Sequence, residues 1–299
     1  VVNIDNHSAL SSFLFITLLF FSLTQDPSTL STYTIITLII LVILTTLYFA
    51  FRIPTGPHLA KKFAGKVIAH RGCRDVKLPT HRIPENSIEA FRWAMANGAE
   101  GIELDVHLTK DDEVVVFHDY TTSRLLPSLQ NQKIGNLTMK EIQSHSFPEY
   151  DNADVDETYL SHQERCPPSL RCVLEMAKKQ NMLVFLETKD VKLTRCRRVA
   201  REIIQIVDDL DMFENVIVIS FIPSTLYFIR RSDPRLLTCL LLTKTLTSSL
   251  VEFYSITNTI SYIILTLFPS LFTTFLGISM IGPTHHILSI KSIQTWQER

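Results

Sequence analysis

Three short apolar runs, each ending or interrupted at polar residues, constrain the fold of this chain more than any other feature. They are residues 67–69 followed by His70 and Arg71, residues 101–108 with Glu103 and Asp105 inside, and residues 114–117 followed by His118. Apolar runs of this length bounded by polar residues are typical of strands buried in a sheet. In a sheet of this kind, the polar side chains would lie together in a surface site where the strands end.

The polar residues form a set that suits one kind of chemistry. Glu103 and Asp105 are two positions apart, so their carboxylates leave the same face of a strand and offer hard oxygen ligands to Mg²⁺ or Ca²⁺. Arg71 presents a planar fork that fits a phosphate. His70 and His118 titrate near neutral pH and can exchange protons on opposite sides of a phosphorus atom. The set therefore predicts metal-assisted cleavage of a phosphodiester.

These residues also resemble the signature of a known family. The ordered matches are His70-Arg71, Pro84-Glu85-Asn86, Glu103-Leu104-Asp105, His118 and Glu187-Thr188-Lys189. The chain is similar in this respect to the glycerophosphodiester phosphodiesterases, from about residue 65 to its C-terminus. The resemblance implies an α/β fold of the TIM-type (β/α) barrel class, a divalent metal, and hydrolysis of glycerophosphodiesters to glycerol 3-phosphate and an alcohol.

The run 183–186 ends at Glu187-Thr188-Lys189, where strand alternation puts Glu187 and Lys189 on one side. A surface ion pair would give the same pattern. The resemblance implies instead that Glu187 completes a metal site with Glu103 and Asp105, and that Lys189 contacts a phosphate oxygen. We expect one divalent ion, Mg²⁺ rather than Ca²⁺.

Glu85 has two interpretations. It is either a first-turn charge on the dipole of a helix that opens at residues 84–87, or a partner that positions a catalytic histidine. His107 could share the face of Asp105, but we expect a structural role for it.

The first 51 residues read as a membrane anchor region. Residues 33–51 carry no charge and are apolar all round, and their number suits a helix crossing a hydrocarbon core of about 20 residues. Residues 52–65 contain two prolines and a glycine before position 60 and are expected to be a linker. The barrel would then occupy residues 66–299.

The residues give two opposing indications of the orientation of that anchor. Basic residues follow the span and none precedes it, which by the positive-inside tendency favours a cytosolic domain. Asn6 and Asn136 lie in glycosylation sequons, which matter only in the lumen. The resemblance to a branch of membrane-anchored glycoproteins favours a lumenal or extracellular domain. The five cysteines permit disulfides there, but their spacing assigns no pairing.

The C-terminal part is apolar, and it supplies fewer strands than a closed barrel needs. Residues 252–282 carry no charge after Glu252, and we expect an apolar insertion beside the barrel mouth; a second membrane span is the alternative. Seven strands can be assigned, at 66–69, 101–108, 114–117, 183–186, 216–219, 236–242 and 276–281. The chain begins at Val1 and ends at Arg299 without an eighth strand, which predicts a fragment of a longer barrel.

Three functions fit these observations. The first is hydrolysis of small glycerophosphodiesters; the second is lysophospholipase D-like hydrolysis of membrane lysophospholipids or N-acyl ethanolamine precursors. Both need the same residues, and only the mouth of the pocket would distinguish them. The third is an inactive membrane-anchored binding protein, although no signature residue is missing. A net charge of −1 argues against a nucleic-acid partner.

Overall fold

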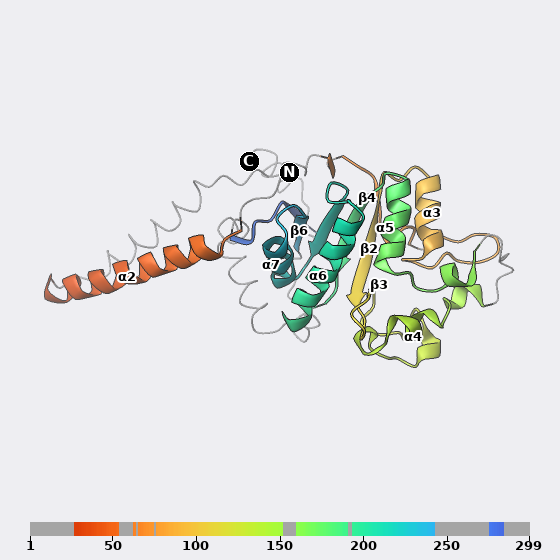
Figure 1. Cartoon of the computed structure of the whole chain (residues 1–299), viewed down its shortest axis with the longest axis horizontal. Coiled ribbons are helices and arrows are strands. Elements are labelled where there is room, and N and C mark those ends of the chain that lie inside the picture. Colours follow the sequence, from red (N-terminus) through yellow and green to blue (C-terminus); the bar gives the residue numbers. More distant parts are fainter. Residues whose placement is uncertain are drawn as a thin grey trace.

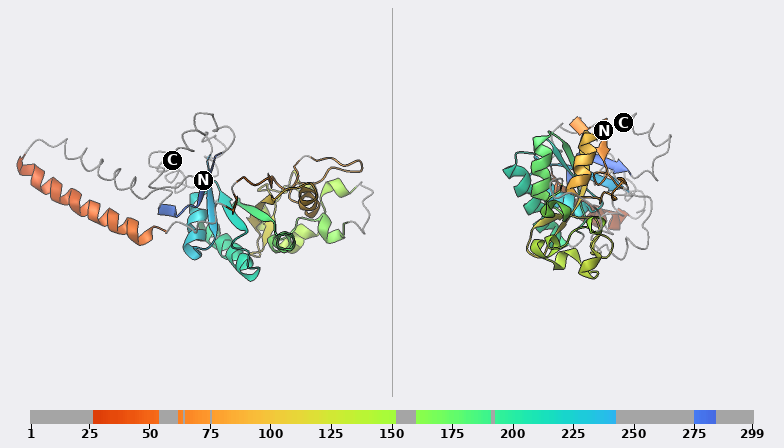
Figure 2. Two further views of the ribbon diagram at one scale, coloured as in Figure 1. Left: turned by 90° about the horizontal axis from the view of Figure 1, so that it is seen from above. Right: turned by 90° about the vertical axis from the view of Figure 1, so that its right-hand side faces the viewer.

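The computed structural model describes residues 27–53, 62–63, 65–74, 76–151, 160–190, 193–242 and 275–283. A single sheet flanked by helices forms the body, and helix α2 (Pro27–Phe51) extends away from it (Figure 1). Figure 2 shows the same extension from above. The described chain is therefore an α/β unit with one protruding helix.

The sheet is mostly parallel. Its strand order is β1-β2-β4-β5-β6-β7, with β3 paired to β2 outside this path. The strands are β1 (Ile68–Ala69), β2 (Gly101–Leu108), β3 (Val114–Val116), β4 (Leu183–Thr188), β5 (Val216–Ser220), β6 (Leu237–Leu242) and β7 (Met280–Pro283). All pairings along the path are parallel, so the carboxyl ends of these strands meet at one edge.

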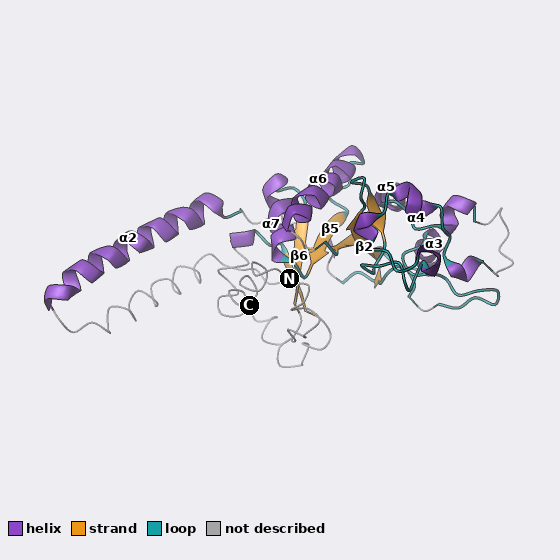
Figure 3. Ribbon diagram, turned by 90° about the horizontal axis from the view of Figure 1, so that it is seen from below, coloured by secondary structure: helices purple, strands orange, loops and turns teal. Residues whose placement is uncertain are grey.

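Helices connect the parallel strands, as crossover connections require. They are α3 (Ile88–Ala96), α4 (Met139–Gln143), α5 (Leu170–Lys179), α6 (Leu193–Asp209) and α7 (Pro223–Ser232). Short 3₁₀ turns lie at Pro127–Leu129, Ile134–Asn136, Pro148–Tyr150 and His162–Arg165. Figure 3 shows α5, α6 and α7 along one side of the strands.

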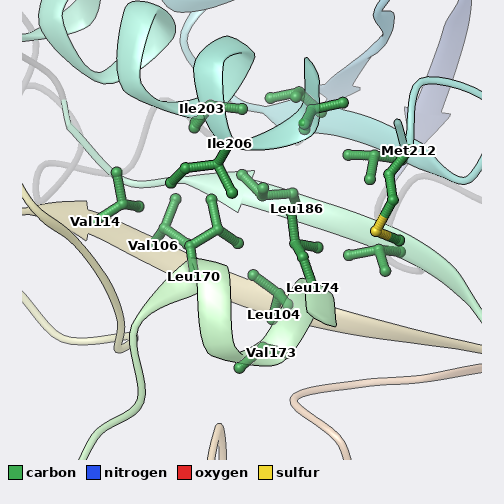
Figure 4. Packing of buried hydrophobic residues seen from close by; sticks show 14 of the residues in the cluster. Leu104, Val106, Val114, Leu170, Val173, Leu174, Leu186, Ile203, Ile206 and Met212 are labelled. Carbon is green, nitrogen blue, oxygen red and sulfur yellow. The ribbon is translucent and has the colours of Figure 1, made fainter. Parts of the chain in front are cut away.

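Strand alternation divides the sheet into two faces with different partners. On β2, Leu104 and Val106 point toward the helices and pack with Leu170 and Leu174 of α5 (Figure 4). On β4, Leu186 joins the same cluster, together with Ile203, Ile206 and Met212. These side chains are almost fully buried. Their contacts fix which residues of each strand face the other way.

The opposite face carries a smaller apolar cluster toward the amino ends of the strands. It contains Phe63, Leu183, Ile217, Ile219, Leu237 and Cys239, with Phe185 packed against them. The centroids of the Phe63 and Phe185 rings are 5.5 Å apart. Phe63, which lies in the range expected to be a linker, therefore packs into the apolar cluster of this face. Nearer the carboxyl ends of β2 and β4, the side chains on this face are polar.

The expectation for residues 114–117 was wrong in one respect. Residues 114–117 were counted among the strands of a TIM-type barrel, whose strands run parallel, but β3 pairs with β2 antiparallel, with Leu108 opposite Val114 and Val106 opposite Val116. A turn of five residues between β2 and β3 is too short for a parallel crossover. The sheet thus contains six parallel strands and one antiparallel strand among the described residues.

Several expectations about the ends of the chain remain predictions. β1 and β7 are the edge strands of the described sheet, and residues 284–299 lie outside the described part. The expected apolar insertion at 252–282 lies largely outside it as well. Whether the barrel lacks a last strand and helix is therefore not tested.

Helix α2 covers the residues expected to form the membrane anchor. Several of its apolar side chains are exposed, among them Ile39, Ile43 and Leu47. Ile53, just after the helix, is buried and donates its N–H to the Phe275 carbonyl over 3.0 Å. Within the described residues, no helix combines the length and apolarity of a membrane span, so the expected span at 33–51 is not supported.

Candidate active site

Three buried carboxylates meet at the carboxyl edge of the sheet. Glu103 and Asp105 lie on β2 and Glu187 lies on β4, where Asp105 and Glu187 are direct partners in the parallel register. One oxygen from each carboxylate lies within 4.8 Å of the other two. All three residues are on the face opposite the helices, as the period of two requires. The structure thus brings together the three acids that the sequence analysis assigned to a metal.

These carboxylates influence one another strongly. Burial, then the negative charges of Asp105 and Glu187, raise the pKa of Glu103 well above its usual range. Burial also raises the pKa of Glu187. Burial opposes ionisation of Asp105 too, but Lys189, His118 and Arg71 outweigh it and lower its pKa. A concentration of negative charge in a buried place needs a compensating cation.

Lys189 supplies part of that compensation. Its Nζ lies 2.9 Å from Asp105 Oδ1 and also donates to Glu187 Oε1. Burial lowers the pKa of Lys189, but the charges of Glu187 and Asp105 outweigh this and raise it. The lysine is therefore charged and lies where a phosphate oxygen would meet it.

The donor set fits a divalent cation. Glu103 accepts a hydrogen bond from the Arg71 backbone N–H over 2.8 Å, but no side-chain cation lies as close to it among the described residues as Lys189 lies to Asp105. Oxygen ligands from three carboxylates suit the hard cations Mg²⁺ and Ca²⁺. A divalent ion among the three would offset both the burial of Glu103 and the repulsion from Asp105 and Glu187, which together raise its pKa.

Arg71 and Asn86 shape the loops next to these acids. Both have positive φ, 53° and 60°, and the Asn86 N–H donates to the Arg71 carbonyl over 3.0 Å. Gly72 follows with φ 78°, and a Cβ there would lie 2.8 Å from the backbone of Ala90 in α3. This close approach explains the glycine, because the absence of a side chain lets the turn pack against the helix.

Asn86 holds Asp105 directly. Its Nδ2 donates to Asp105 Oδ2 over 2.8 Å, and its Oδ1 accepts from the Asp105 N–H over 3.3 Å. Arg71 Nε lies 3.4 Å from the same Oδ2. These contacts fix the orientation of a carboxylate that would bind the metal.

His70 lies at the rim of the acid cluster. Its side chain is 56% exposed, and its Nε2 is 3.9 Å from Glu103 Oε2. Burial and the neighbouring Arg71 lower its pKa, which favours the neutral ring near pH 7. A neutral, accessible imidazole can accept a proton from a nucleophile.

His118 reaches the same region by a different route from the one expected. The antiparallel β3 turns the chain back along β2, and the Phe117 N–H donates to the Asp105 carbonyl over 2.8 Å. His118 follows directly, with its Nδ1 2.7 Å from Asp119 Oδ1. The chain reversal, rather than a third parallel strand end, therefore brings the second histidine to the carboxylates.

His107 has the structural role that we expected. Its ring is buried, its Nε2 is 3.1 Å from the His118 carbonyl oxygen, and it contacts the Tyr120 ring edge to face at 5.1 Å. Burial lowers its pKa. A buried neutral ring with a backbone partner packs against its neighbours and holds them in position, and it does not take part in the reaction.

Glu85 does not lie in the first turn of a helix. Helix α3 begins only at Ile88, and Ser87 caps it by accepting from the Ala90 N–H. The Glu85 carboxylate instead accepts from Arg71 Nη1 over 3.0 Å and from Arg124 Nη2 over 2.7 Å. Of the two interpretations, the one as a dipole charge was wrong.

Three residues of this site received no role from the sequence: Asn86, Asp119 and Arg124. Asn86 is itself part of the matched Pro84-Glu85-Asn86 run and Asp119 follows His118, so their positions were a usable signal. Arg124 stands in a polar loop after β3, and nothing in its local sequence shows that it lies beside Glu85, 39 residues away. Its role depends on tertiary structure alone.

Comparisons with known proteins agree with this geometry. The model of the glycerophosphoryl diester phosphodiesterase family matches residues 70–258. A glycerophosphodiester phosphodiesterase from Caldanaerobacter subterraneus is 33% identical over 170 residues, 57% of this chain and 63% of that protein. The human protein lysophospholipase D GDPD1 is 40% identical over 83 residues, 27% of this chain and 24% of that protein. The matched part thus spans less than two thirds of these relatives.

A solved structure shows the same fold. The glycerophosphodiester phosphodiesterase from Agrobacterium tumefaciens superposes with a TM-score of 0.52 at 21% identity, covering 78% of this chain and 81% of that one. The matched family region contains every residue of the acid cluster, both histidines, Arg71 and Lys189. The chain belongs to the glycerophosphoryl diester phosphodiesterase family.

Proposed function

We propose that this chain hydrolyses glycerophosphodiesters to glycerol 3-phosphate and an alcohol with the help of one divalent ion. The observation that carries the proposal is the cluster of Glu103, Asp105 and Glu187, within 4.8 Å of one another, with a charged lysine against two of them. Membership of the family and the similarity to the glycerophosphodiester phosphodiesterase from Caldanaerobacter subterraneus support the substrate class.

Each side chain has a defined part in this proposal. Glu103, Asp105 and Glu187 would hold the ion, which when bound would polarise a phosphate oxygen. Lys189 and Arg71 bind the phosphate through their positive charges and stabilise the charge that develops on it. Both cations are fixed in position by carboxylates before the substrate arrives, so their orientation costs little at the moment of reaction.

Two histidines complete the proton transfers. One of His70 and His118 removes a proton from the attacking hydroxyl, either of water or of the substrate glycerol, and the other gives a proton to the departing alkoxide. The pKa of His70 is lowered, which suits it to the role of base. The 2.7 Å contact between His118 Nδ1 and Asp119 Oδ1 holds the second ring in place for the other proton transfer.

Mg²⁺ is the ion that we propose, since three carboxylate oxygens leave room for water ligands in an octahedral shell. Measuring the thermal midpoint with Mg²⁺ and with Ca²⁺ at equal concentrations tests this choice. A larger upward shift with Ca²⁺ would reverse it.

The test of the activity is a turnover assay on glycerophosphoinositol, glycerophosphocholine and a lysophospholipid, with glycerol 3-phosphate and lysophosphatidate as the measured products. We expect activity that EDTA abolishes and that His70→Ala lowers by at least about 100-fold, the lower end of the usual contribution of a general acid or base. His162→Ala, which changes an exposed histidine on a 3₁₀ turn, is the matched control and should retain activity.

A lysophospholipase D activity is the second candidate, favoured by the similarity to the human protein of that name. The assay separates the two, because only the second releases lysophosphatidate from a lysophospholipid. A folded parent chain that binds the ion yet turns over none of these substrates would instead support a binding protein.

We also propose that the catalytic part lies in a lumenal or extracellular compartment and carries a glycan at Asn136. Asn136 is exposed in the structure, which supports access to its sequon, while Asn6 lies outside the described residues. Expression in a secretory cell, with glycosidase treatment of the parent and of Asn136→Gln, tests this. A parent chain whose mass is unchanged by the glycosidase would contradict it.

A further inference from the structure

Arg124 links two carboxylates that come from different loops. Its Nε donates to Asp119 Oδ2 over 2.7 Å and its Nη2 to Asp119 Oδ1 over 2.7 Å, a two-pronged contact. The same Nη2 donates to Glu85 Oε1 over 2.7 Å. Asp119 follows β3, whereas Glu85 precedes α3, so one guanidinium joins the two loops that border the acid cluster.

Each of these carboxylates contacts a residue that the proposed mechanism uses. Asp119 Oδ1 lies 2.7 Å from His118 Nδ1. Glu85 Oε1 accepts from Arg71 Nη1 over 3.0 Å. Arg124 is therefore one contact away from a proton-transferring imidazole on one side and from a phosphate-binding guanidinium on the other.

The contact to Asp119 also determines the chemistry of His118. A carboxylate can only accept at His118 Nδ1, so the ring keeps its proton there and presents Nε2 to the substrate. Arg124 contributes to this by holding both oxygens of Asp119. Burial opposes ionisation of Asp119, but the hydrogen bonds from His118 and Arg124 hold its pKa well below the usual range.

A second metal site would be another explanation for this cluster. Glu85, His118 and Asp119 each offer a ligand atom, and these atoms lie within 4.8 Å of one another. However, both carboxylates already accept from guanidinium groups, which supply the positive charge that an ion would bring. The arrangement thus fits a network built on arginine.

We propose that Arg124 is a positioning residue that orients His118 through Asp119 and Arg71 through Glu85. The proposal rests on the function proposed above for His118 and Arg71. Arg124 itself is about half exposed, with 48% of its side chain accessible. Its removal should therefore leave the fold intact while the two groups lose their fixed directions.

Kinetics of three variants test the proposal. For Arg124→Ala we expect a kcat lower by about 10-fold to 100-fold, as expected when a reacting group is misplaced by about 1 Å, with KM within about 3-fold of the parent. Arg124→Lys offers one point charge for three contacts and should recover only part of the loss. Methylguanidine in the buffer should restore activity to Arg124→Ala in a saturable way. Arg171→Ala, an arginine of α5 with similar exposure that pairs with Asp209, should behave as the parent.

A second measurement does not depend on turnover. In ¹⁵N-histidine-labelled protein, with His118 assigned from a His118→Gln spectrum, the parent ring should carry its proton on Nδ1. In Arg124→Ala the ring should shift toward a mixture of tautomers. A parent with the proton on Nε2, or an Arg124→Ala ring identical to the parent, would overturn the proposal. A parent without activity but with the expected ring signals would overturn the proposed function instead.

Discussion

At the scale of single residues, the site is organised by unbalanced charge. Burial and the charges of Asp105 and Glu187 raise the pKa of Glu103, and the close hydrogen bond that it accepts within the described part of the chain comes from the Arg71 backbone N–H. Such a group costs stability in the ion-free protein and contributes affinity when the ion binds. Function and stability therefore oppose each other at this one position.

We predict that Glu103→Gln makes the ion-free protein as stable as the parent or more stable, by about 1 kcal/mol, since a buried amide carries no charge to repel its neighbours. The same variant should lose the rise in thermal midpoint that Mg²⁺ gives the parent. Differential scanning calorimetry with and without Mg²⁺ measures both effects.

Glu100→Gln is the control for that prediction, because Glu100 is exposed and pairs with Lys66 at a distance from the cluster. It should keep the full response to Mg²⁺. A Glu103→Gln protein with an unchanged response would remove Glu103 from the ligand set.

Asn86 combines a strained backbone with a structural contact, and two substitutions separate these properties. Asn86→Ala loses both hydrogen bonds to Asp105 and places an alanine at φ 60°, a further cost of about 1 kcal/mol. Asn86→Gly loses the same bonds without the backbone cost.

We therefore expect the glycine variant to be the more stable of the two in urea denaturation, and both to bind Mg²⁺ about 10-fold to 100-fold more weakly, the usual cost of removing a partner of a metal ligand. Equal ion affinity in the parent and in both variants would show that Asn86 does not position Asp105.

At the scale of elements, the sequence predicted strands better than it predicted their directions. The extent of β2 was predictable because its apolar residues alternate with Glu103 and Asp105, and that of β4 was nearly so because a continuous apolar run ends at Glu187. The direction of β3 depends on the length of a turn between two strands, and its apolar run of valines is equally compatible with either pairing. The same reversal delivers His118, so its position was predicted correctly for a reason that was incomplete.

Helix α5 offers a test of how an element supports the site. Ser169 caps it by accepting from the Cys172 N–H over 3.2 Å, and the Val116 N–H of β3 donates to the adjacent Pro168 carbonyl over 2.9 Å. The start of α5 is thus attached to the strand that leads to His118. Loss of the cap should therefore destabilise both α5 and β3.

We predict that Ser169→Ala lowers the free energy of unfolding by about 1 kcal/mol, the typical cost of losing a helix cap. Ser169→Asp, which keeps an acceptor and adds a favourable charge at the helix N-terminus, should stay close to the parent. Urea denaturation followed by circular dichroism measures both. An alanine variant as stable as the aspartate variant would show that the cap contributes nothing here.

At the scale of the whole molecule, one face of the sheet forms most of the apolar core and the other face carries the candidate active site. The face toward the helices holds the larger apolar cluster, and the opposite face holds the smaller apolar cluster and the three acids. The period of two made this division predictable, whereas the link between distant loops through Arg124 was not, because it follows only from how the loops fold back.

The five free cysteines can report how the molecule opens as a whole. Cys73 and Cys166 are buried in loops, Cys196 in α6 and Cys239 in β6, while Cys172 is exposed on α5. Burial raises the pKa of Cys73 and of Cys239 to about 12, so both remain uncharged thiols at pH 8. Only the thiolate reacts with iodoacetamide, and the reagent also needs access.

We predict that iodoacetamide at pH 8 modifies Cys172 first and the four buried thiols only when the molecule unfolds. Mg²⁺ at about 100 times its dissociation constant stabilises the native state by about 2.7 kcal/mol, so it should slow all four by a common factor of about 100 and leave Cys172 unaffected. Mass spectrometry of the peptides measures each rate. If Cys239 of β6 were not slowed while Cys73 was, the far side of the sheet would open independently of the ion site, and the sheet would not unfold as one unit.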